Sequence, residues 1–186
     1  MLIAIIVVVV IVALVGFVII GFNKLRSTDI GAQEALGGID VQLTRRAELI
    51  PNLVETVKGY ASHERELLEE ITRARSAVQS AAAGSDVPAK AAADAQLQGA
   101  LGRLNIAVEA YPDLKANVNF LDLQKQLAET ENQIAFARTY YNDAVAKLNK
   151  LVATIPWMFF SGLAKVSSRQ FYQAPDAQRS APTVQF

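Results

Sequence analysis

The chain has 186 residues, with 18 lysines and arginines against 18 aspartates and glutamates, and 52% of its residues are hydrophobic. It has no cysteine and one histidine, which excludes disulfides, thiolate chemistry and metal sites built from cysteines or paired histidines. The balanced charge offers no broad basic surface for nucleic acid. We therefore expect no metal, no cofactor, no catalytic residue and no nucleic-acid partner.

The N-terminal segment, residues 1–22, contains only hydrophobic residues apart from Gly16 and Gly21, and the first charge is Lys24. A helix of this length measures roughly 33 Å, enough to cross a hydrocarbon core of about 30 Å. No basic region precedes the segment and no small-residue cleavage site follows it, unlike a signal peptide. We predict a retained transmembrane anchor over residues 1–23.

Basic residues follow the anchor but do not precede it. Lys24 and Arg26 lie directly after the apolar run. Because positive charge is enriched on the cytoplasmic side of a span, we predict the N-terminus outside and the following domain in the cytoplasm.

Beyond the anchor the hydrophobic pattern is helical, with no convincing strand. Two interleaved rows with heptad spacing predict one long helix from about Ile39 to Val78. The rows are Leu43, Ile50, Val57, Ile71 and Val78, interrupted by Glu64, and Ile39, Leu53, Tyr60, Leu67 and Ala74, interrupted by Arg46. Pro51 removes one backbone hydrogen bond, so we predict a bend there rather than an end.

The middle of the chain predicts a loop and then a second helix. Turn-forming residues at positions 84–88 favour a loop over residues 81–95. Apolar residues from Leu97 to Tyr111 then recur at steps of three and four. Pro112 is expected to stop or kink this helix, and Asn119 to cap the next one.

The third predicted helix, from Asn119 to Ile155, is the most regular. Its two rows are Phe120, Leu127, Ile134, Tyr141, Leu148 and Ile155, and Leu123, Thr130, Ala137, Ala144 and Leu151. Pro156 ends it, and a shorter fourth helix is expected over about 158–172.

These elements predict an all-α fold: a single transmembrane helix followed by an antiparallel up-down-up-down bundle of three long helices and a short fourth. The predicted divisions are the transmembrane anchor 1–23, a juxtamembrane connector 24–38, the bundle 39–172 and a flexible C-terminal tail 173–186.

Two polar sets were candidates for chemistry. His63 with Glu66 and Glu70 lacks the second histidine that a zincin or carboxylate-bridged site needs, so it indicates a solvated helix face. Arg46 lies on the apolar row and is expected to form a buried ion pair with an acidic residue of another helix. The candidates for its partner are Glu109, Glu129 and Glu131.

A ligand site around Arg46, Asn52 and Glu131 is the alternative use of these interhelical polar residues. A pocket of about 300 Å³ or more lined by this set would favour a ligand, whereas a sealed apolar core would favour a scaffold. Asparagines are also numerous in the helical segments, and we expect some to form hydrogen bonds between helices. They are Asn52, Asn105, Asn117, Asn119, Asn132, Asn142 and Asn149.

The uncharged stretch 151–164 includes Trp157, Met158, Phe159 and Phe160, a candidate interaction cluster. It is too short to span a membrane, and is either a packed end of the core or an exposed contact surface. The up-down-up-down order puts it at the end of the bundle farthest from the membrane, so we expect it to contact a second copy or another protein.

Several ordered blocks closely resemble the LemA family. The blocks are Ile39-Asp40-Val41-Gln42-Leu43, Arg45-Arg46, Leu49-Ile50-Pro51-Asn52-Leu53-Val54-Glu55-Thr56-Val57-Lys58-Gly59-Tyr60, His63-Glu64, Glu109-Ala110-Tyr111-Pro112-Asp113-Leu114-Lys115-Ala116-Asn117, and Thr130-Glu131-Asn132 with Ala137-Arg138 and Tyr141-Asn142. The resemblance implies a bacterial single-span protein of the inner membrane with a helical bundle and no established enzymatic activity. Some relatives are linked to membrane remodelling in organelle-forming bacteria.

One departure from the family pattern lies at Leu36-Gly37-Gly38, where the family often carries a bulky aromatic and polar residues. Because glycine weakens a helix, we expect helix continuity to be reduced between anchor and bundle.

The leading interpretation is a non-enzymatic, membrane-anchored scaffold or adaptor in membrane organisation or remodelling. It would contact the lipid bilayer through residues 1–23 and bind itself, as a homo-oligomer, or a membrane protein partner. The alternative is a ligand-binding or enzymatic bundle that uses the polar site around Arg46 and Asn52.

Overall fold

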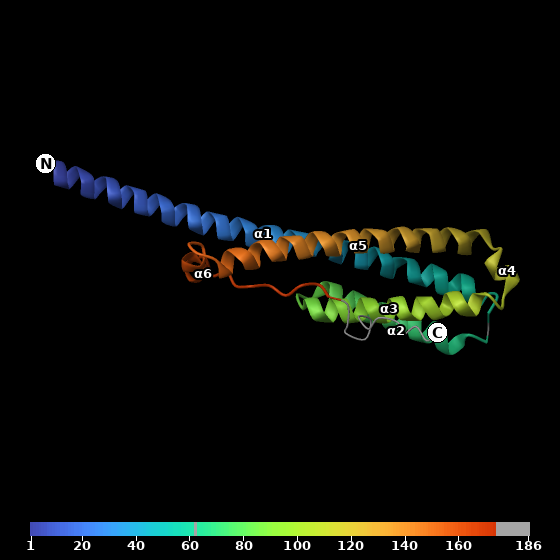
Figure 1. The fold of residues 1–186 in the computed structure, drawn as a ribbon. Helices are drawn as coiled ribbons and strands as arrows, with labels where there is room; N and C mark the ends of the chain where they lie inside the picture. The colour runs from blue at the N-terminus through green and yellow to red at the C-terminus, as the bar shows by residue number, and fades with distance from the viewer. Residues whose placement is uncertain (62, 174–186) are drawn as a thin grey trace, which may run out of the picture. The chain divides into compact units, whose positions relative to one another are not determined.

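The computed structural model describes residues 1–61 and 63–173, and these are all helical or irregular, with no strand among them. The helices of the described chain, shown in Figure 1, are α1 (Leu2–Lys58), α2 (Arg65–Ala83), α3 (Val87–Val108), α4 (Pro112–Lys115), α5 (Val118–Ala153) and α6 (Met158–Ala164). The predicted all-α class is confirmed.

Helix α1 is continuous over its 57 residues. It passes through Gly37 and Gly38 without a break, so the expected loss of continuity there is wrong. Each glycine costs a helix about 1 kcal/mol relative to alanine, and burial of the flanking Leu36 and Ile39 offsets this cost. The helix also continues past Pro51, as predicted, because proline removes only one backbone hydrogen bond.

The single long helix predicted from Ile39 to Val78 is wrong. Helix α1 ends at Lys58, and α2 begins at Arg65 after a turn in which the Ala61 N–H donates to the Val57 carbonyl at 2.8 Å. Gly59 directly follows the last helical residue, a position where helices commonly end.

The predicted loop over 81–95 is also largely wrong. Only Gly84–Asp86 separates α2 from α3, because the alanines on both sides are strong helix formers. Asp86 caps α3: its carboxylate accepts a hydrogen bond from the Ala89 N–H at 3.3 Å.

The second half of the chain differs from prediction mainly at helix ends. Pro112 begins the short helix α4, where its missing N–H costs nothing. The cap of α5 is Asn117, whose side-chain oxygen accepts from the Phe120 N–H at 3.1 Å, and not Asn119.

The fourth helix is shorter than predicted. Helix α6 ends at Ala164, its C-cap Lys165 has a left-handed φ of 52°, and the chain then continues without helix to residue 173. The prediction of a flexible tail concerns residues 173–186, of which only Gln173 belongs to the described residues.

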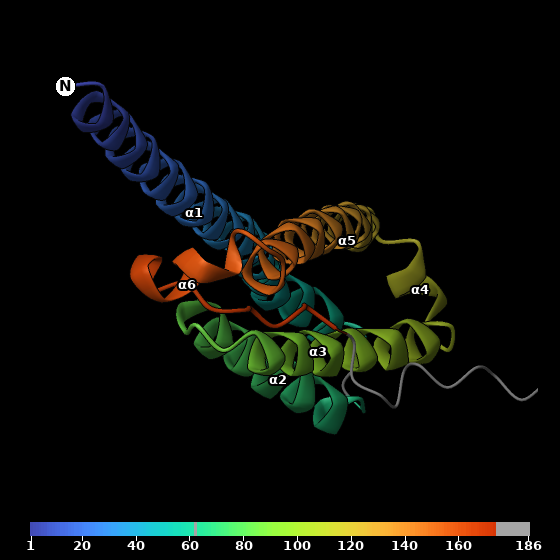
Figure 2. The ribbon, with the colours of Figure 1, turned by 60° about the vertical axis from the view of Figure 1, so that its left-hand side comes forward.

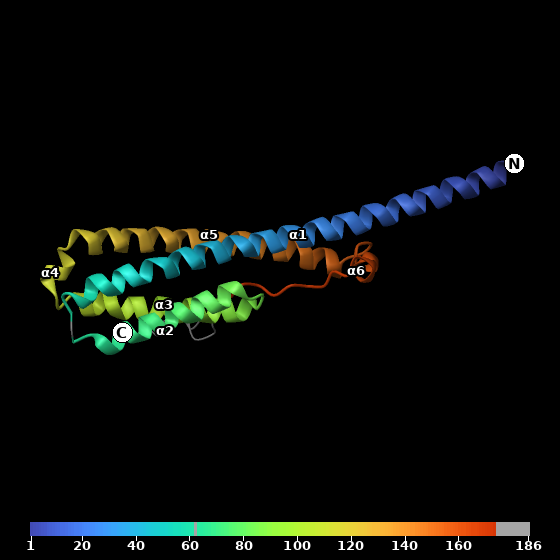
Figure 3. The same ribbon diagram turned by 180° about the vertical axis from the view of Figure 1, so that it is seen from behind.

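The chain divides into two compact units, and α1 and α5 each contribute to both. Unit 2 comprises Gly37–Thr139 together with Tyr172–Phe186, of which residues to 173 are described. Within it, α2 and α3 lie side by side and run in opposite directions (Figures 1 and 3). Large buried residues of this unit are Ile39, Leu43, Ile50, Leu53, Ile71, Leu97, Leu104, Leu114 and Phe120.

Unit 1 comprises Met1–Leu36 and Tyr140–Phe171. It contains the first part of α1, the last part of α5, helix α6 and the extended segment after α6 (Figure 2). Its core cluster is Leu25, Ala32, Leu148, Phe160, Ala164 and Val166.

The N-terminal part of α1 is exposed nearly all round, and Figure 3 shows it extending beyond α6. An 18-residue window in this helix has a mean hydropathy of 3.7 and no buried residue. This segment is long and apolar enough to cross a membrane. It is not packed as a core helix, because a core helix would bury one face.

Candidate functional site

A buried network of charges occupies the centre of unit 2. Arg46 of α1 donates from Nη1 to Asp94 Oδ1 of α3 at 2.6 Å and from Nη2 to Glu131 of α5. Arg138 of α5 donates from Nη2 to Asp94 Oδ2, and the Tyr172 hydroxyl lies 3.2 Å from the same oxygen. The Arg138 guanidinium also lies over the Tyr172 ring, 5.2 Å from its centroid. Asp94 of α3 thus joins α1, α5 and Tyr172 within unit 2.

The network is balanced in charge. Asp94 is 0% exposed and Arg46 3%, and the two guanidinium groups face two carboxylates. The second oxygen of Glu131 accepts from Gln98 at 3.1 Å. Buried charges are tolerated only when paired and hydrogen-bonded, and here both carboxylates have at least two donors each. The arrangement is typical of a structural ion network rather than of a free acid or base.

Burial raises the pKa of Tyr172, and the Asp94 carboxylate raises it further, while Arg138 opposes this shift. For Arg138, burial alone would lower the pKa, but the charge of Asp94 and the hydrogen bond to it outweigh burial, so the pKa is raised. Tyr172 is therefore a neutral phenol and Arg138 a permanent cation at neutral pH.

Replacing Tyr172 with phenylalanine should reduce the loss of stability in alkali. A group whose pKa is raised by folding stabilises the native state below its unfolded pKa of about 10 and loses that contribution as pH rises above it. The wild-type free energy of unfolding should therefore fall more steeply between pH 10 and 11 than that of Tyr172→Phe, by up to about 1.4 kcal/mol per pH unit. Urea titrations at a series of pH values measure this, and equal slopes would contradict it.

The structure brings together two of the three predicted interhelical polar residues, Arg46 and Glu131. Asn52 is exposed and lines a separate hollow beside Asn119 and Asp122 of α5. The other proposed partners of Arg46 lie elsewhere, since Glu109 pairs with Lys115 at 2.5 Å and Glu129 is exposed.

A hollow of about 400 Å³ opens beside Arg46 and Glu131, with Gln98, Asn105 and Gln124 among its polar lining residues. Its volume meets the criterion for a ligand pocket, but Asn52 does not line it. Both charged groups at this hollow are already paired with one another. It could hold a small polar molecule, yet no unpaired cation faces it among the lining residues described.

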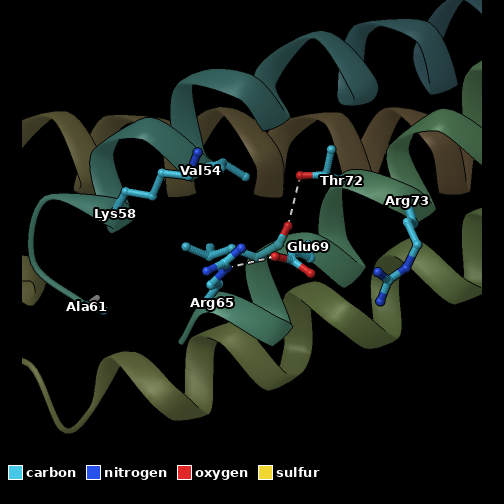
Figure 4. Close-up of a pocket in the computed structure, with 8 residues that line it drawn as sticks. Val54, Lys58, Ala61, Arg65, Glu69, Thr72 and Arg73 are labelled. Atoms are coloured by element: carbon cyan, nitrogen blue, oxygen red, sulfur yellow. Dashed lines mark hydrogen bonds and ion pairs between the residues drawn. The ribbon is translucent and has the colours of Figure 1, made fainter. Parts of the chain in front are cut away.

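A larger groove of about 690 Å³ lies between the end of α1 and α2 (Figure 4). Val54, Ala61 and Leu68 are buried in its apolar floor. Its charged lining residues are Lys58, Arg65, Glu69 and Arg73, and Arg65 pairs with Glu69 at 2.9 Å. Three cations and one carboxylate give this groove a basic rim around an apolar floor.

His63 is exposed and lies in the turn before α2. It therefore does not share a helix face with Glu66 and Glu70, although the sequence indicated that it would. Glu70 pairs instead with Arg103 of α3. Among residues 1–61 and 63–173, no group of three or more histidines, cysteines, aspartates or glutamates is placed to hold a metal ion.

The aromatic cluster of α6 packs against the apolar part of α1. The Phe160 ring meets the Phe17 ring edge to face, at 5.2 Å between centroids and 72° between planes. A Cβ atom on Gly21 would overlap the Phe160 ring, so only glycine permits this approach. Of the cluster, Phe160 is buried, Trp157 is half-buried, and Met158 and Phe159 are exposed.

This contact corrects the predicted location of the cluster at the end farthest from the membrane. The unpredicted turn after Lys58 adds one reversal of chain direction. An extra reversal brings the end of α5, and α6 with it, back to the apolar part of α1. Apart from Gly21 in the apolar run, no feature of the sequence indicates this contact.

The extended segment after α6 is held by side chains that the sequence analysis did not pair. Asn149 of α5 donates to the Arg169 carbonyl and accepts from the Arg169 N–H, both at 2.9 Å. The Arg169 side chain pairs with Asp29 of α1 at 2.7 Å, and the Tyr141 hydroxyl donates to the Gln170 carbonyl at 2.8 Å. Asn149 thus ties α5 to a non-helical segment, whereas Asn105 of α3 accepts a hydrogen bond from Gln124 of α5 at 3.2 Å, a contact between helices as expected for some of the asparagines.

Comparison with known proteins agrees with this fold. The chain is 22% identical to Magnetosome protein MamQ 2 of Paramagnetospirillum magneticum, over 90% of this chain and 70% of that protein. It is 22% identical to Magnetosome protein MamQ of Magnetospirillum gryphiswaldense, over 89% and 70% of the two chains. It is 26% identical to Protein LemA of Metamycoplasma hominis, over 71% of this chain and 59% of that protein.

The family model of the LemA family matches residues 35–186. That range contains α2 to α6 and every charged residue of the buried network. The match to this family and the apolar N-terminal helix fit a membrane-associated helical protein. The chain belongs to the LemA family.

Proposed function

We propose that the protein is a non-enzymatic, membrane-anchored scaffold or adaptor whose helical bundle binds other proteins, or a second copy, at the membrane. One observation carries the proposal. Helix α1 combines an exposed apolar segment with a second half that is buried in a bundle, in one uninterrupted element. Such a helix presents a folded domain at a membrane surface.

The relatives support a role in membrane organisation or remodelling, since several are named as magnetosome proteins. Lys24 and Arg26 after the span favour a single-pass protein of the bacterial inner membrane with the N-terminus outside and the bundle in the cytoplasm. Labelling a Ser180→Cys variant of this cysteine-free chain in intact cells with an impermeant reagent tests the orientation: labelling would place the bundle outside.

The basic groove gives the scaffold a specific contact surface. Its apolar floor would take the apolar face of an amphipathic helix, and Lys58, Arg65 and Arg73 would favour a partner helix with carboxylates along its edges. The chemistry therefore selects an acidic amphipathic helix as the occupant.

A photo-crosslinking amino acid at Thr72, on the rim of this groove, tests the proposal in cells. We expect a crosslinked species of one discrete added mass, and we expect Arg65→Glu combined with Arg73→Glu to reduce its yield about ten-fold or more by reversing the rim charge. The matched control places the same crosslinker, and separately a charge reversal, at Lys125, an exposed lysine of α5. A chain that stays uncrosslinked at Thr72, or crosslinks equally in the reversed variant, would count against the groove as a binding surface.

The hollow beside Arg46 and Glu131 favours a second candidate function, the binding of a small polar ligand. A ligand there should stabilise the chain against heat in proportion to its concentration. Leu101→Trp would fill the hollow and should abolish that stabilisation, and it replaces no residue of the ion network. An absence of any shift across a panel of cytoplasmic metabolites would leave the scaffold without this rival.

A further inference from the structure

Helix α6 docks at the level where the apolar segment of α1 ends. The Phe160 ring contacts Phe17 and closely approaches Gly21, while the first charge of α1 is Lys24. At 1.5 Å per residue, Phe17 and Gly21 lie about 11 Å and 5 Å before that charge along the helix. The buried face of α6 is therefore level with the last turns of the span.

The face of α6 that carries Phe159 and Leu163 is apolar and exposed. In α6, Phe159 is 70%, Leu163 59% and Met158 42% exposed, and Ile155, in the turn before the helix, is 72% exposed. Residues 151–164 contain no charge, whereas Lys150 and Lys165 flank the stretch on both sides. Exposing such an apolar surface to water is unfavourable, and large exposed apolar patches in proteins mark interaction sites.

We propose that α6 is a second membrane contact, lying in the interface of the same bilayer that α1 crosses, with Phe159 and Leu163 inserted among the lipid chains. With seven helical residues it is too short to span the bilayer, but it suits an interfacial position. Trp157 is the residue type enriched at that depth, and the flanking lysines reach toward lipid phosphates. This inference rests on the proposed membrane anchoring by α1.

Lipid is favoured over a second copy of the chain as the occupant, because the exposed face of α6 is continuous with the apolar segment of α1. The exposed face of α6 lies next to the apolar N-terminal segment of α1, which is itself exposed on every side. The lipid that would surround this segment would therefore also cover α6. Burial of Phe159 and Leu163 in acyl chains then needs no additional protein surface.

The chain supplies its own probe, since Trp157 is its one tryptophan. The full-length protein is reconstituted in phosphatidylcholine vesicles that carry bromine on the acyl chain, either near the headgroup or near the chain end. We expect strong quenching of Trp157 by the shallow bromine, weaker quenching by the deep one, and little quenching by acrylamide in the aqueous phase.

Phe159→Asp should reduce the shallow quenching by about two-fold or more, because an aspartate is expelled from lipid. Phe136→Asp is the matched control: it changes an equally exposed phenylalanine of α5 and should leave quenching unchanged. Quenching by acrylamide in place of brominated lipid would overturn the inference, and so would shielding from both quenchers, which would indicate a second copy on this face. Co-flotation of the chain with the vesicles separates the two proposals: a chain that floats without lipid quenching retains its anchor but not this contact, whereas a chain that does not float loses both.

Discussion

Replacing Asp94 with alanine should lower the free energy of unfolding by about 3–5 kcal/mol, as is typical when one partner of a buried ion pair is removed. Asp94 is fully buried and pairs with Arg46 and Arg138, so its loss leaves two guanidinium groups with too few acceptors. Their Nε atoms already lack a partner among the described residues. Urea titration of the full-length chain in nanodiscs, followed by far-ultraviolet circular dichroism, measures the change.

The matched control is Glu129→Ala, which removes an exposed carboxylate of α5 and should change stability by less than about 0.5 kcal/mol. Asp94→Asn should fall between the two, since an amide oxygen still accepts hydrogen bonds but carries no charge. If Asp94→Ala unfolds at the wild-type urea concentration, the network does not stabilise the bundle.

Replacing Asp40 with alanine should cost about 3 kcal/mol, at the lower end of the range for buried pairs. Lys90 of α3 is 0% exposed, and its ammonium group is held by the Asp40 carboxylate and by the Ala82 carbonyl at 2.9 Å. Without Asp40, only a neutral carbonyl remains to balance a buried positive charge. Asp40 is partly exposed, which allows water to reach the gap and places the expected loss at the lower end.

A second substitution distinguishes loss of the pair from loss of packing. Asp40→Ala combined with Lys90→Met removes both charges and keeps the volume of the buried chain, so the double variant should regain most of the lost stability. A double variant that is as unstable as the sum of its two single variants would show that the residues act independently.

The heptad pattern predicted which faces are buried but not where the chain turns. Leu43, Ile50, Val57, Ile71 and Val78 are all buried, as their common row requires. The row nevertheless spans the turn between α1 and α2. Buried residues of two separate helices that face one core can by coincidence lie a multiple of seven residues apart. Gly59 after Lys58 and the polar Glu64 inside the row were the local signals that the periodicity outweighed.

The candidate site was only partly predictable for the same kind of reason. Arg46 on an apolar row indicated a buried partner, and Glu131 was among the acids considered. The sequence does not single out Asp94, because the turn-forming residues at positions 84–88 favour a loop over this stretch, although the alanines around Asp94 favour helix more than any other residue. The network as a whole depends on which helices are neighbours, and spacing within one helix carries no such information.

The pairing of Asn149 with Arg169 makes α6 part of a closed loop rather than of a loose chain end. If α6 leaves Phe17, it stays tethered both at Ala153 and at Arg169. Re-docking of α6 on Phe17 is then an intramolecular step, on a time scale comparable to the roughly 10–100 ns for closing a ten-residue loop. The effective concentration of α6 at this site is about millimolar or more. A second copy of the chain would have to capture a helix that is held at both ends, so the double tether disfavours exchange of α6 by domain swapping.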